Sequence, residues 1–433
     1  MSKLAINGGT PVRVAPFPMR RTMGEAEKQA VMAVMDTDKI SGFFGSPGDQ
    51  WLGGEYVQAF ERKWAEAYGF AHAISVNSWS TGLMTAIGAI GIEPGDEVIV
   101  SPYTMSASAT SILFYGGIPV FADIDPDSFN ITADTIAKVI SPRTKAIMVV
   151  HIFGQAADMD PILALARQHG LKVIEDAAQA PGVRYKGRPV GCLGDIGGFS
   201  LNYHKHIHTG EGGVLVTQDA QLAKRCQLIR NHAENLLEYT GMEDMCNMIG
   251  SNYRLTEIQA AIGSAQLDKL EGLLALRQRL AAHLSAALQG LPGVTPPKTD
   301  PNCGHAYYLY PIKYDAAVTG VSRADLVRAV NAELPHAAHW EQTVLAQAYV
   351  KPLYLAALYQ KKIALGSKGF PWTLQPEVEY NYAKGSCPVV EKMHEEQMIF
   401  TPIVREPLTE RDMDDVAAAF HKVLHNLDQI PRA

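Results

Sequence analysis

Long apolar runs and clusters of basic residues are absent from this sequence of 433 residues. No apolar run reaches the roughly 18 residues of a membrane-spanning helix, and Met1–Thr10 lacks the basic flank and apolar stretch of a signal peptide. The basic pairs Arg20-Arg21 and Lys361-Lys362 are isolated, so we interpret them as solvated surface. With a net charge of −7, the sequence argues against membrane and nucleic-acid partners and predicts a cytoplasmic protein.

Cysteine is also scarce, and no two cysteines are close in the chain. Neither a Cys-x-x-Cys pair nor a nearby histidine-rich spacing is present, so the sequence predicts no metal site. We expect free, packed thiols in a reducing compartment. The five residues are Cys192, Cys226, Cys246, Cys303 and Cys387.

Short apolar runs alternate with helix-like stretches between about residues 70 and 220. This rhythm predicts an α/β fold in which one mostly parallel, seven-stranded sheet lies between helices. Each run is apolar throughout, as expected for a strand covered on both faces. The expected strands are Ala73–Val76, Glu97–Ser101, Pro119–Ala122, Ala146–His151, Lys172–Glu175, Ile196–Ser200 and Gly213–Thr217.

The last third of the chain has a different pattern. Leu255 to Ala287 is apolar-periodic and predicts one or two helices, followed by a strand within His305–Lys313 and a closing helix over Glu410–Leu427. The region 335–385 is polar and aromatic and contains no motif. We therefore expect an N-terminal arm (1–25), a large cofactor-binding domain (26–270) and a smaller α+β C-terminal domain (271–433).

Two residues in the large domain suggest chemistry. Lys205 precedes the turn Gly210-Glu211-Gly212-Gly213, and Asp176 follows the run Lys172–Glu175 at the carboxyl end of a strand, where α/β sheets bind ligands. Most lysines are simply solvated cations. A pyridoxal phosphate enzyme, however, needs a lysine that forms an imine and an acid against the ring nitrogen. Lys205 and Asp176 meet both needs.

The same cofactor needs donors for its phosphate, and Asn77–Gly82 lies between a strand and a helix, where anions bind. The hydroxyls of Ser78 and Ser80 suit this role, although a simple helix cap is the commoner explanation for such residues. Ser200 is a second phosphate donor in this interpretation. Tyr103, after the strand ending at Ser101, either stacks on the cofactor or packs in the core.

Two further polar residues are interpreted as structural. His151 ends a strand, and a hydrogen-bonded packing role is the more frequent one for such a histidine. Glu175 precedes Asp176 directly, so its side chain should point to the opposite face of the sheet.

The sequence resembles the DegT/DnrJ/EryC1/StrS family of sugar aminotransferases, which are pyridoxal phosphate enzymes of fold type I. The resemblance rests on five collinear motifs that span nearly the whole chain. They are Leu4–Pro11, Pro94–Val100, Pro119–Asp125, Glu175–Ala180 and Lys205–Gly213.

The resemblance implies a role for each matching residue. Lys205 forms the internal aldimine, Asp176 pairs with the pyridine nitrogen, Gln179 lies near the phenolic oxygen and Tyr103 covers the ring. Ser80 and Ser200 match phosphate-contacting hydroxyls. Asn252 matches an asparagine that reaches the phosphate of the neighbouring subunit, which implies a homodimer with shared active sites.

The chain departs from the family pattern at two places. Trp79 stands where the family usually has glycine, so the turn either changes conformation or Trp79 shapes the substrate pocket. His204, His206 and His208 crowd Lys205, and some relatives that remove a sugar hydroxyl have histidine in place of the lysine. Here the glycine turn puts Lys205 in the lysine position, which favours transamination.

The implied reaction moves an amino group from glutamate or glutamine to the ketone of a sugar, usually nucleotide-linked in this family, or of a cyclitol. The opening Asn7–Pro11 looks like the cyclitol branch. Two alternatives stay open. One is a pyridoxal phosphate-dependent sugar dehydratase, which Lys205 disfavours. The other is a catalytically silent, cofactor-binding regulatory protein, against which the intact Lys205 and Asp176 argue.

Overall fold

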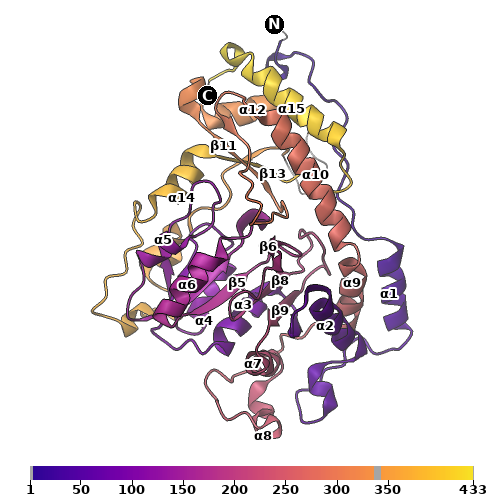
Figure 1. The fold of residues 1–433 in the computed structure, drawn as a ribbon, viewed down its shortest axis with the longest axis vertical. Coiled ribbons are helices and arrows are strands. Elements are labelled where there is room, and N and C mark those ends of the chain that lie inside the picture. The colour runs from indigo at the N-terminus through magenta and orange to yellow at the C-terminus, as the bar shows by residue number, and fades with distance from the viewer. Residues whose placement is uncertain (1–2, 336–342, 433) are drawn as a thin grey trace.

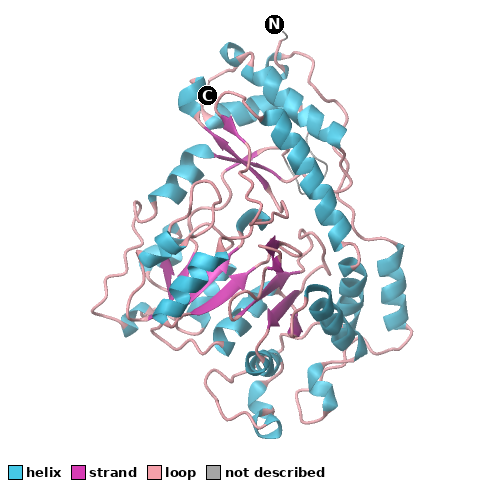
Figure 2. Cartoon of the chain, viewed as in Figure 1, coloured by secondary structure: helices cyan, strands magenta, loops and turns pink. Residues whose placement is uncertain are grey.

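The computed structural model describes residues 3–335 and 343–432. Its strands form two separate groups, each with its own helices (Figure 2). The lower body in Figure 1 contains a seven-stranded sheet, and the upper body contains a four-stranded sheet. Within the described ranges, no helix combines the length and the hydropathy needed to cross a membrane.

All seven expected strands form the large sheet, in the order β1-β9-β8-β5-β4-β2-β3. Neighbours from β8 to β3 run parallel, whereas β9 is antiparallel to both β1 and β8. The mostly parallel α/β sheet is therefore confirmed. Its strands are β1 (His72–Val76), β2 (Glu97–Val100), β3 (Ile118–Phe121), β4 (Thr144–Val150), β5 (Lys172–Asp176), β8 (Ile196–Ser200) and β9 (Gly213–Thr217), and β6 (Arg184–Tyr185) pairs with β7 (Arg188–Pro189) outside it.

Helices cover both faces of this sheet, which explains why its strands are apolar throughout. Neighbouring residues such as Val98 and Ile99 belong to two different core clusters, one with α3, α4 and α7 and the other with α2, α6 and α9. The helices of this body are α1 (Glu25–Met35), α2 (Glu55–Tyr68), α3 (Trp79–Ala89), α4 (Ala107–Phe114), α5 (Ala133–Ala137), α6 (Met159–His169), α7 (Ala220–Arg230), α8 (Leu237–Thr240) and α9 (Glu257–Leu267).

The upper body contains an antiparallel sheet in the order β10-β11-β13-β12, packed against α10, α12 and α15. Its elements are α10 (Leu270–Leu288), β10 (Val294–Thr295), β11 (Tyr310–Tyr314), α11 (Ala316–Thr319), α12 (Arg323–Glu333), β12 (Ala346–Gln347), β13 (Met398–Thr401) and α15 (Glu410–Leu424). The short helices α13 (Ala357–Lys361) and α14 (Pro388–Lys392) pack against the core of the large sheet instead. The expected α+β character is confirmed. The boundaries near residues 25 and 270 stay predictions, although α10 starts close to the second one.

Residues 353 to 385 cover the β2–β3 edge of the large sheet, whereas residues 343 to 347 lead into β12 of the small sheet; residues 336–342 of the motif-free region lie outside the described residues. The Tyr380 hydroxyl donates to Glu97 Oε1 at 2.9 Å, and the Tyr382 hydroxyl donates to the Pro119 carbonyl at 2.8 Å. Aromatic residues in this segment therefore dock it onto the sheet.

Candidate active site

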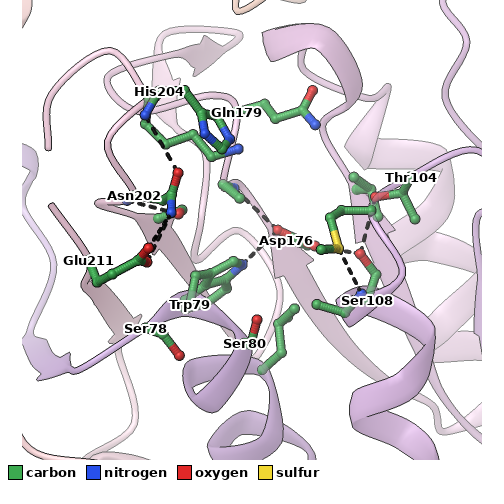
Figure 3. A pocket seen from close by; sticks show the side chains of 17 residues that line it. Ser78, Trp79, Ser80, Thr104, Ser108, Asp176, Gln179, Asn202, His204 and Glu211 are labelled. Atoms are coloured by element: carbon green, nitrogen blue, oxygen red, sulfur yellow. Dashed lines mark hydrogen bonds between the residues drawn. The ribbon is translucent and has the colours of Figure 1, made fainter. Parts of the chain in front are cut away.

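One pocket lies where β5 and β8 end and α3 begins (Figure 3). The sheet topology explains the position, because β5 and β8 are parallel neighbours and their carboxyl ends meet at one edge. Seven of the nine predicted site residues line this pocket: Ser78, Trp79, Ser80, Asp176, Gln179, Ser200 and Lys205.

Lys205 is buried, with only 8% of its surface exposed. Burial disfavours the charged amine and lowers its pKa from 10.5 to about 8, while the nearby Asp176 opposes this shift. The ammonium nitrogen lies 4.3 Å from the centre of the Tyr308 ring, and the Lys205 backbone N–H donates to the Asn202 carbonyl at 2.9 Å. Lys205 is therefore a fixed amine that can lose its proton, unlike a solvated surface lysine.

Asp176 is the last residue of β5, and three donors hold its carboxylate. The Trp79 indole N–H donates to Oδ1 at 2.7 Å, and the Ala178 backbone N–H donates to the same oxygen at 3.2 Å. The Ser108 hydroxyl donates to Oδ2 at 2.7 Å. The carboxylate is thus fixed by neighbours from α3, from α4 and from the loop after β5.

Glu175 points away from the pocket, as the strand alternation predicts. Its carboxylate accepts the Gly191 N–H at 2.7 Å and the Gly194 N–H at 2.8 Å, and it lies 3.0 Å from His151 Nε2. The other ring nitrogen of His151 accepts the Ala157 N–H at 3.1 Å, so Nε2 carries the proton and donates to Glu175. The packing role expected for His151 matches these contacts.

The N-terminus of α3 presents hydroxyl groups to the pocket. Ser78 caps the helix, because its hydroxyl accepts the Thr81 N–H at 3.2 Å. Ser80 is exposed in the first turn, and Ser200 Oγ accepts the Asn202 N–H at 3.3 Å. A helix N-terminus with hydroxyls around it is an anion site, so the cap and the predicted phosphate role are compatible.

Trp79 does not disturb this turn. It is the first residue of α3, downstream of an ordinary serine cap, and its indole is buried beneath the pocket with 6% exposed. The side chain reaches Asp176 from below (Figure 3). The alternative that the tryptophan alters the turn is therefore not what the structure shows.

Gln179 is held in one orientation by two contacts. Its Oε1 accepts the Phe153 N–H at 2.6 Å, and its Nε2 donates to the Tyr349 hydroxyl at 3.1 Å. These partners assign the amide oxygen and nitrogen and leave one N–H of Nε2 for a ligand. Tyr349 comes from the segment that follows β12, and no local pattern in the sequence predicts its presence here.

Tyr103 and Asn252 do not line the pocket. Tyr103 is fully buried; its hydroxyl accepts the Tyr349 N–H at 3.0 Å, and its ring packs edge-on against Phe153. This position suits core packing, the second of the two interpretations, and not a cover for the cofactor ring; Thr104 and Met105, which follow it, line the pocket instead. Asn252 is exposed in this single chain, and its role toward a second subunit stays a prediction.

Three arginines meet behind the lysine loop, and the sequence reasoning missed them. Arg20 Nε lies 2.7 Å from Glu406 Oε1, Arg277 Nε lies 3.3 Å from Glu406 Oε2, and Arg405 Nη1 donates to the Glu406 carbonyl at 2.7 Å. The three arginines line a second, smaller pocket together with His204, Tyr308, Leu309 and Pro402. Interpreting Arg20 as solvated surface was wrong, since only 6% of its side chain is exposed.

We define Arg20, Arg277 and Arg405 as the arginine cluster. The Glu406 carboxylate pairs with Arg20 and Arg277; burial opposes its ionisation, but these two arginines hold its pKa below the usual value. His204 lines both the second pocket and the main one. The two pockets are therefore adjacent at the lysine loop.

Burial favours the neutral form of the three histidines around Lys205 by lowering their pKa values. Burial lowers the pKa of His204 and of His208 to about 4, with added repulsion from Arg20. His206 is fully buried, and its Nε2 lies 2.9 Å from the Ala306 carbonyl, to which it donates. His206 thus anchors the lysine loop to the upper body and does not replace the lysine.

The model of the DegT/DnrJ/EryC1/StrS aminotransferase family matches residues 45–399. The chain belongs to this family. It is 41% identical over 288 residues to GDP-perosamine synthase of Caulobacter vibrioides, covering 66% of this chain and 74% of that protein. It is 32% identical to L-glutamine:2-deoxy-scyllo-inosose aminotransferase of Streptomyces lividus, covering 98% of both chains. The solved aminotransferase of Psychrobacter cryohalolentis superposes with a TM-score of 0.81 at 28% identity, covering 95% of this chain and 100% of that one.

As a member of the DegT/DnrJ/EryC1/StrS family, the chain is a pyridoxal phosphate-dependent aminotransferase of fold type I. Its pocket fits that cofactor. Lys205 supplies a deprotonable amine, Asp176 keeps one acceptor position beyond its three donors, and the N-terminus of α3 offers an anion site.

Proposed function

We propose that this aminotransferase moves an amino group from glutamate or glutamine to the ketone of a sugar or a cyclitol, in the biosynthesis of amino sugars or aminocyclitols. The observation that carries the proposal is that the buried Lys205 and the anchored Asp176 lie in one pocket. The names of the relatives support the acceptor class, because one is a GDP-perosamine synthase and another acts on 2-deoxy-scyllo-inosose.

The residues of the pocket have separate roles in this reaction. Pyridoxal phosphate, when bound, supplies an electron sink for the substrate carbon. Lys205 Nζ would take the proton from that carbon and deliver it to the cofactor carbon that carries the amino group, since a pKa of about 8 leaves part of the amine neutral near pH 7. Asp176 would hold the ring nitrogen, Ser78, Ser80 and Ser200 would hold the phosphate, and the remaining N–H of Gln179 would serve the phenolic oxygen.

The arginine cluster supports an amino acid as the donor. Glutamate and glutamine both carry a carboxylate, for which arginine is the preferred partner. The second pocket adjoins Lys205 through His204, so an anionic group held there lies next to the reacting amine. The arginine-lined pocket is consistent with glutamate and with glutamine as the amino donor.

The two alternatives are less well supported. A dehydratase of the type with histidine in place of the lysine would need His206 in that position, but His206 is fixed to the Ala306 carbonyl and Lys205 faces the pocket. A catalytically silent protein is disfavoured because the chain belongs to an aminotransferase family and keeps both Lys205 and Asp176 in one pocket.

We also propose a cytoplasmic homodimer with shared active sites. Asn252 is exposed next to strongly exposed apolar residues such as Ile249 and Met245, and Met105 exposes its side chain at the rim of the pocket. Exposed apolar side chains of this kind mark contact surfaces. All five cysteines are free, which supports the reducing compartment.

The half-reactions test the proposal directly. Purified protein loaded with pyridoxal phosphate is mixed with glutamate or glutamine, and the change in cofactor absorbance is followed. The resulting amino form is then offered keto-sugars, nucleotide-linked and free, and keto-cyclitols. We expect one acceptor class to restore the starting spectrum. A spectrum that no amino donor changes would contradict transamination.

A further inference from the structure

Trp79 makes a contact that its position in a phosphate turn did not lead us to expect. Its indole lies under the pocket, and the ring N–H donates to Asp176 Oδ1 at 2.7 Å (Figure 3). Both partners are buried, with 6% of Trp79 and 4% of Asp176 exposed. A buried hydrogen bond to an acid is stronger than an exposed one and is little disturbed by water.

Two glycines make room for the indole. A Cβ atom at Gly82, in α3, would lie 2.5 Å from the Trp79 ring, and one at Gly198, in β8, would lie 2.6 Å from it. Real side chains do not approach so closely, so the ring is confined between α3 and the sheet. The N–H direction is fixed by this packing and not by Asp176 alone.

The geometry also determines which oxygen of Asp176 can serve a ligand. An ionised carboxylate has about four acceptor positions. Trp79 and Ala178 occupy the two on Oδ1, and Ser108 occupies one on Oδ2. Both donors to Oδ1 are N–H groups, so this oxygen acts only as an acceptor here. One acceptor position on Oδ2 is left for the ring nitrogen of the cofactor.

We infer that Trp79 is a positioning residue for the cofactor, acting through Asp176: its N–H anchors Oδ1 so that Oδ2 meets the ring nitrogen in one fixed orientation. The inference rests on the cofactor and not on the identity of the amino acceptor. Its test therefore remains decisive whether or not a sugar or cyclitol is the substrate.

Trp79→Phe removes the donor and keeps an aromatic ring in the cavity. Trp372→Phe is the matched control, because Trp372 is also buried and also donates its indole N–H, to the Tyr382 hydroxyl at 3.0 Å, away from the pocket. We expect Trp79→Phe to weaken binding of pyridoxal phosphate to the apo-protein about tenfold. We expect the visible circular dichroism of the bound cofactor to decrease as well, while Trp372→Phe leaves both unchanged.

A double-mutant cycle separates positioning from general damage. If Trp79 acts through Asp176, Trp79→Phe has little further effect on cofactor affinity in an Asp176→Asn background. Equal losses in both backgrounds, in variants whose far-UV circular dichroism shows that they are folded, would overturn the inference. Unchanged affinity and unchanged visible dichroism in Trp79→Phe would overturn it too.

Discussion

Glu175 and Asp176 are adjacent in β5, yet their carboxylates serve opposite faces of the sheet. Asp176 faces the pocket and accepts from Trp79 and Ser108, whereas Glu175 faces the other core and accepts the backbone N–H groups of Gly191 and Gly194. The Asp176 carboxylate therefore serves the active-site pocket, whereas the Glu175 carboxylate stabilises the fold.

Substituting each acid by its amide should separate these roles. Glu175→Gln puts an NH₂ group against backbone donors and should lower the free energy of unfolding by about 1–3 kcal/mol, because buried N–H groups lose their acceptor. Asp176→Asn should instead reduce the rate of the first half-reaction, about tenfold or more, with a smaller loss of stability. Urea denaturation and stopped-flow absorbance measure the two effects; the same ranking of both variants in both assays would contradict this division.

Lys205 should make the apo-protein less stable at neutral pH. Below about pH 8 the amine of Lys205 is charged in the folded chain, although it is buried. Between pH 8 and 10.5 the folded state has released this proton, whereas the unfolded state still binds it. The free energy of unfolding therefore rises with pH in this range. Lys205→Met should therefore raise the free energy of unfolding at pH 7 by up to about 3 kcal/mol. The difference between variant and parent, measured by denaturant titration, should shrink from pH 8 to 10.5. A difference independent of pH would argue against a lowered pKa.

The arginine cluster should determine how well the donor binds. Arg405→Gln removes a guanidinium that lines the second pocket and should weaken apparent donor binding in the first half-reaction about tenfold, with a smaller effect on its limiting rate. Arg411→Gln, in the exposed first turn of α15, is the matched control and should behave like the parent. Donor titrations followed by cofactor absorbance give both quantities, and equal behaviour of the two variants would exclude a donor site here.

Shared active sites can be tested with mixed dimers. Lys205→Ala and Asn252→Ala should each be nearly inactive alone, the first because it lacks the amine and the second because it lacks the proposed contact to the neighbouring subunit. Unfolding and refolding the two together should restore up to about a quarter of the parental activity, because some mixed dimers have one intact site. Sedimentation gives the oligomeric state, and no recovery in a proven mixed dimer would count against Asn252.

The large sheet could be predicted from the sequence because its strands are covered on both faces. Each one appears as a continuous apolar run, and the chemistry follows directly after such a run at Asp176 and Ser200. Lys205 was predictable for a different reason, since its spacing to the glycine turn matches a family pattern. Local sequence and motif spacing thus located most of the pocket.

Long-range contacts supplied what the sequence did not show. Tyr349 reaches Gln179 from 170 residues away, and Arg405 joins Arg20 from the far end of the chain. Neither hydrophobic periodicity nor turn residues indicate such long-range contacts, because the contacts depend on how the two bodies pack. Tyr103 was uncertain for the same reason: the residues that surround its ring come from distant segments.

Gly82 and Gly198 limit which side chains are compatible with Trp79. A Cβ at either position would collide with the indole, so tryptophan is tolerated only where both glycines already stand. Gly198 is required for a second reason, because a Cβ there would also lie 2.1 Å from the Val214 carbonyl oxygen, whereas at Gly82 the indole ring is the nearest group. Homologues with Trp at position 79 should therefore also have glycine at position 82, whereas homologues with glycine at 79 are free to vary at 82.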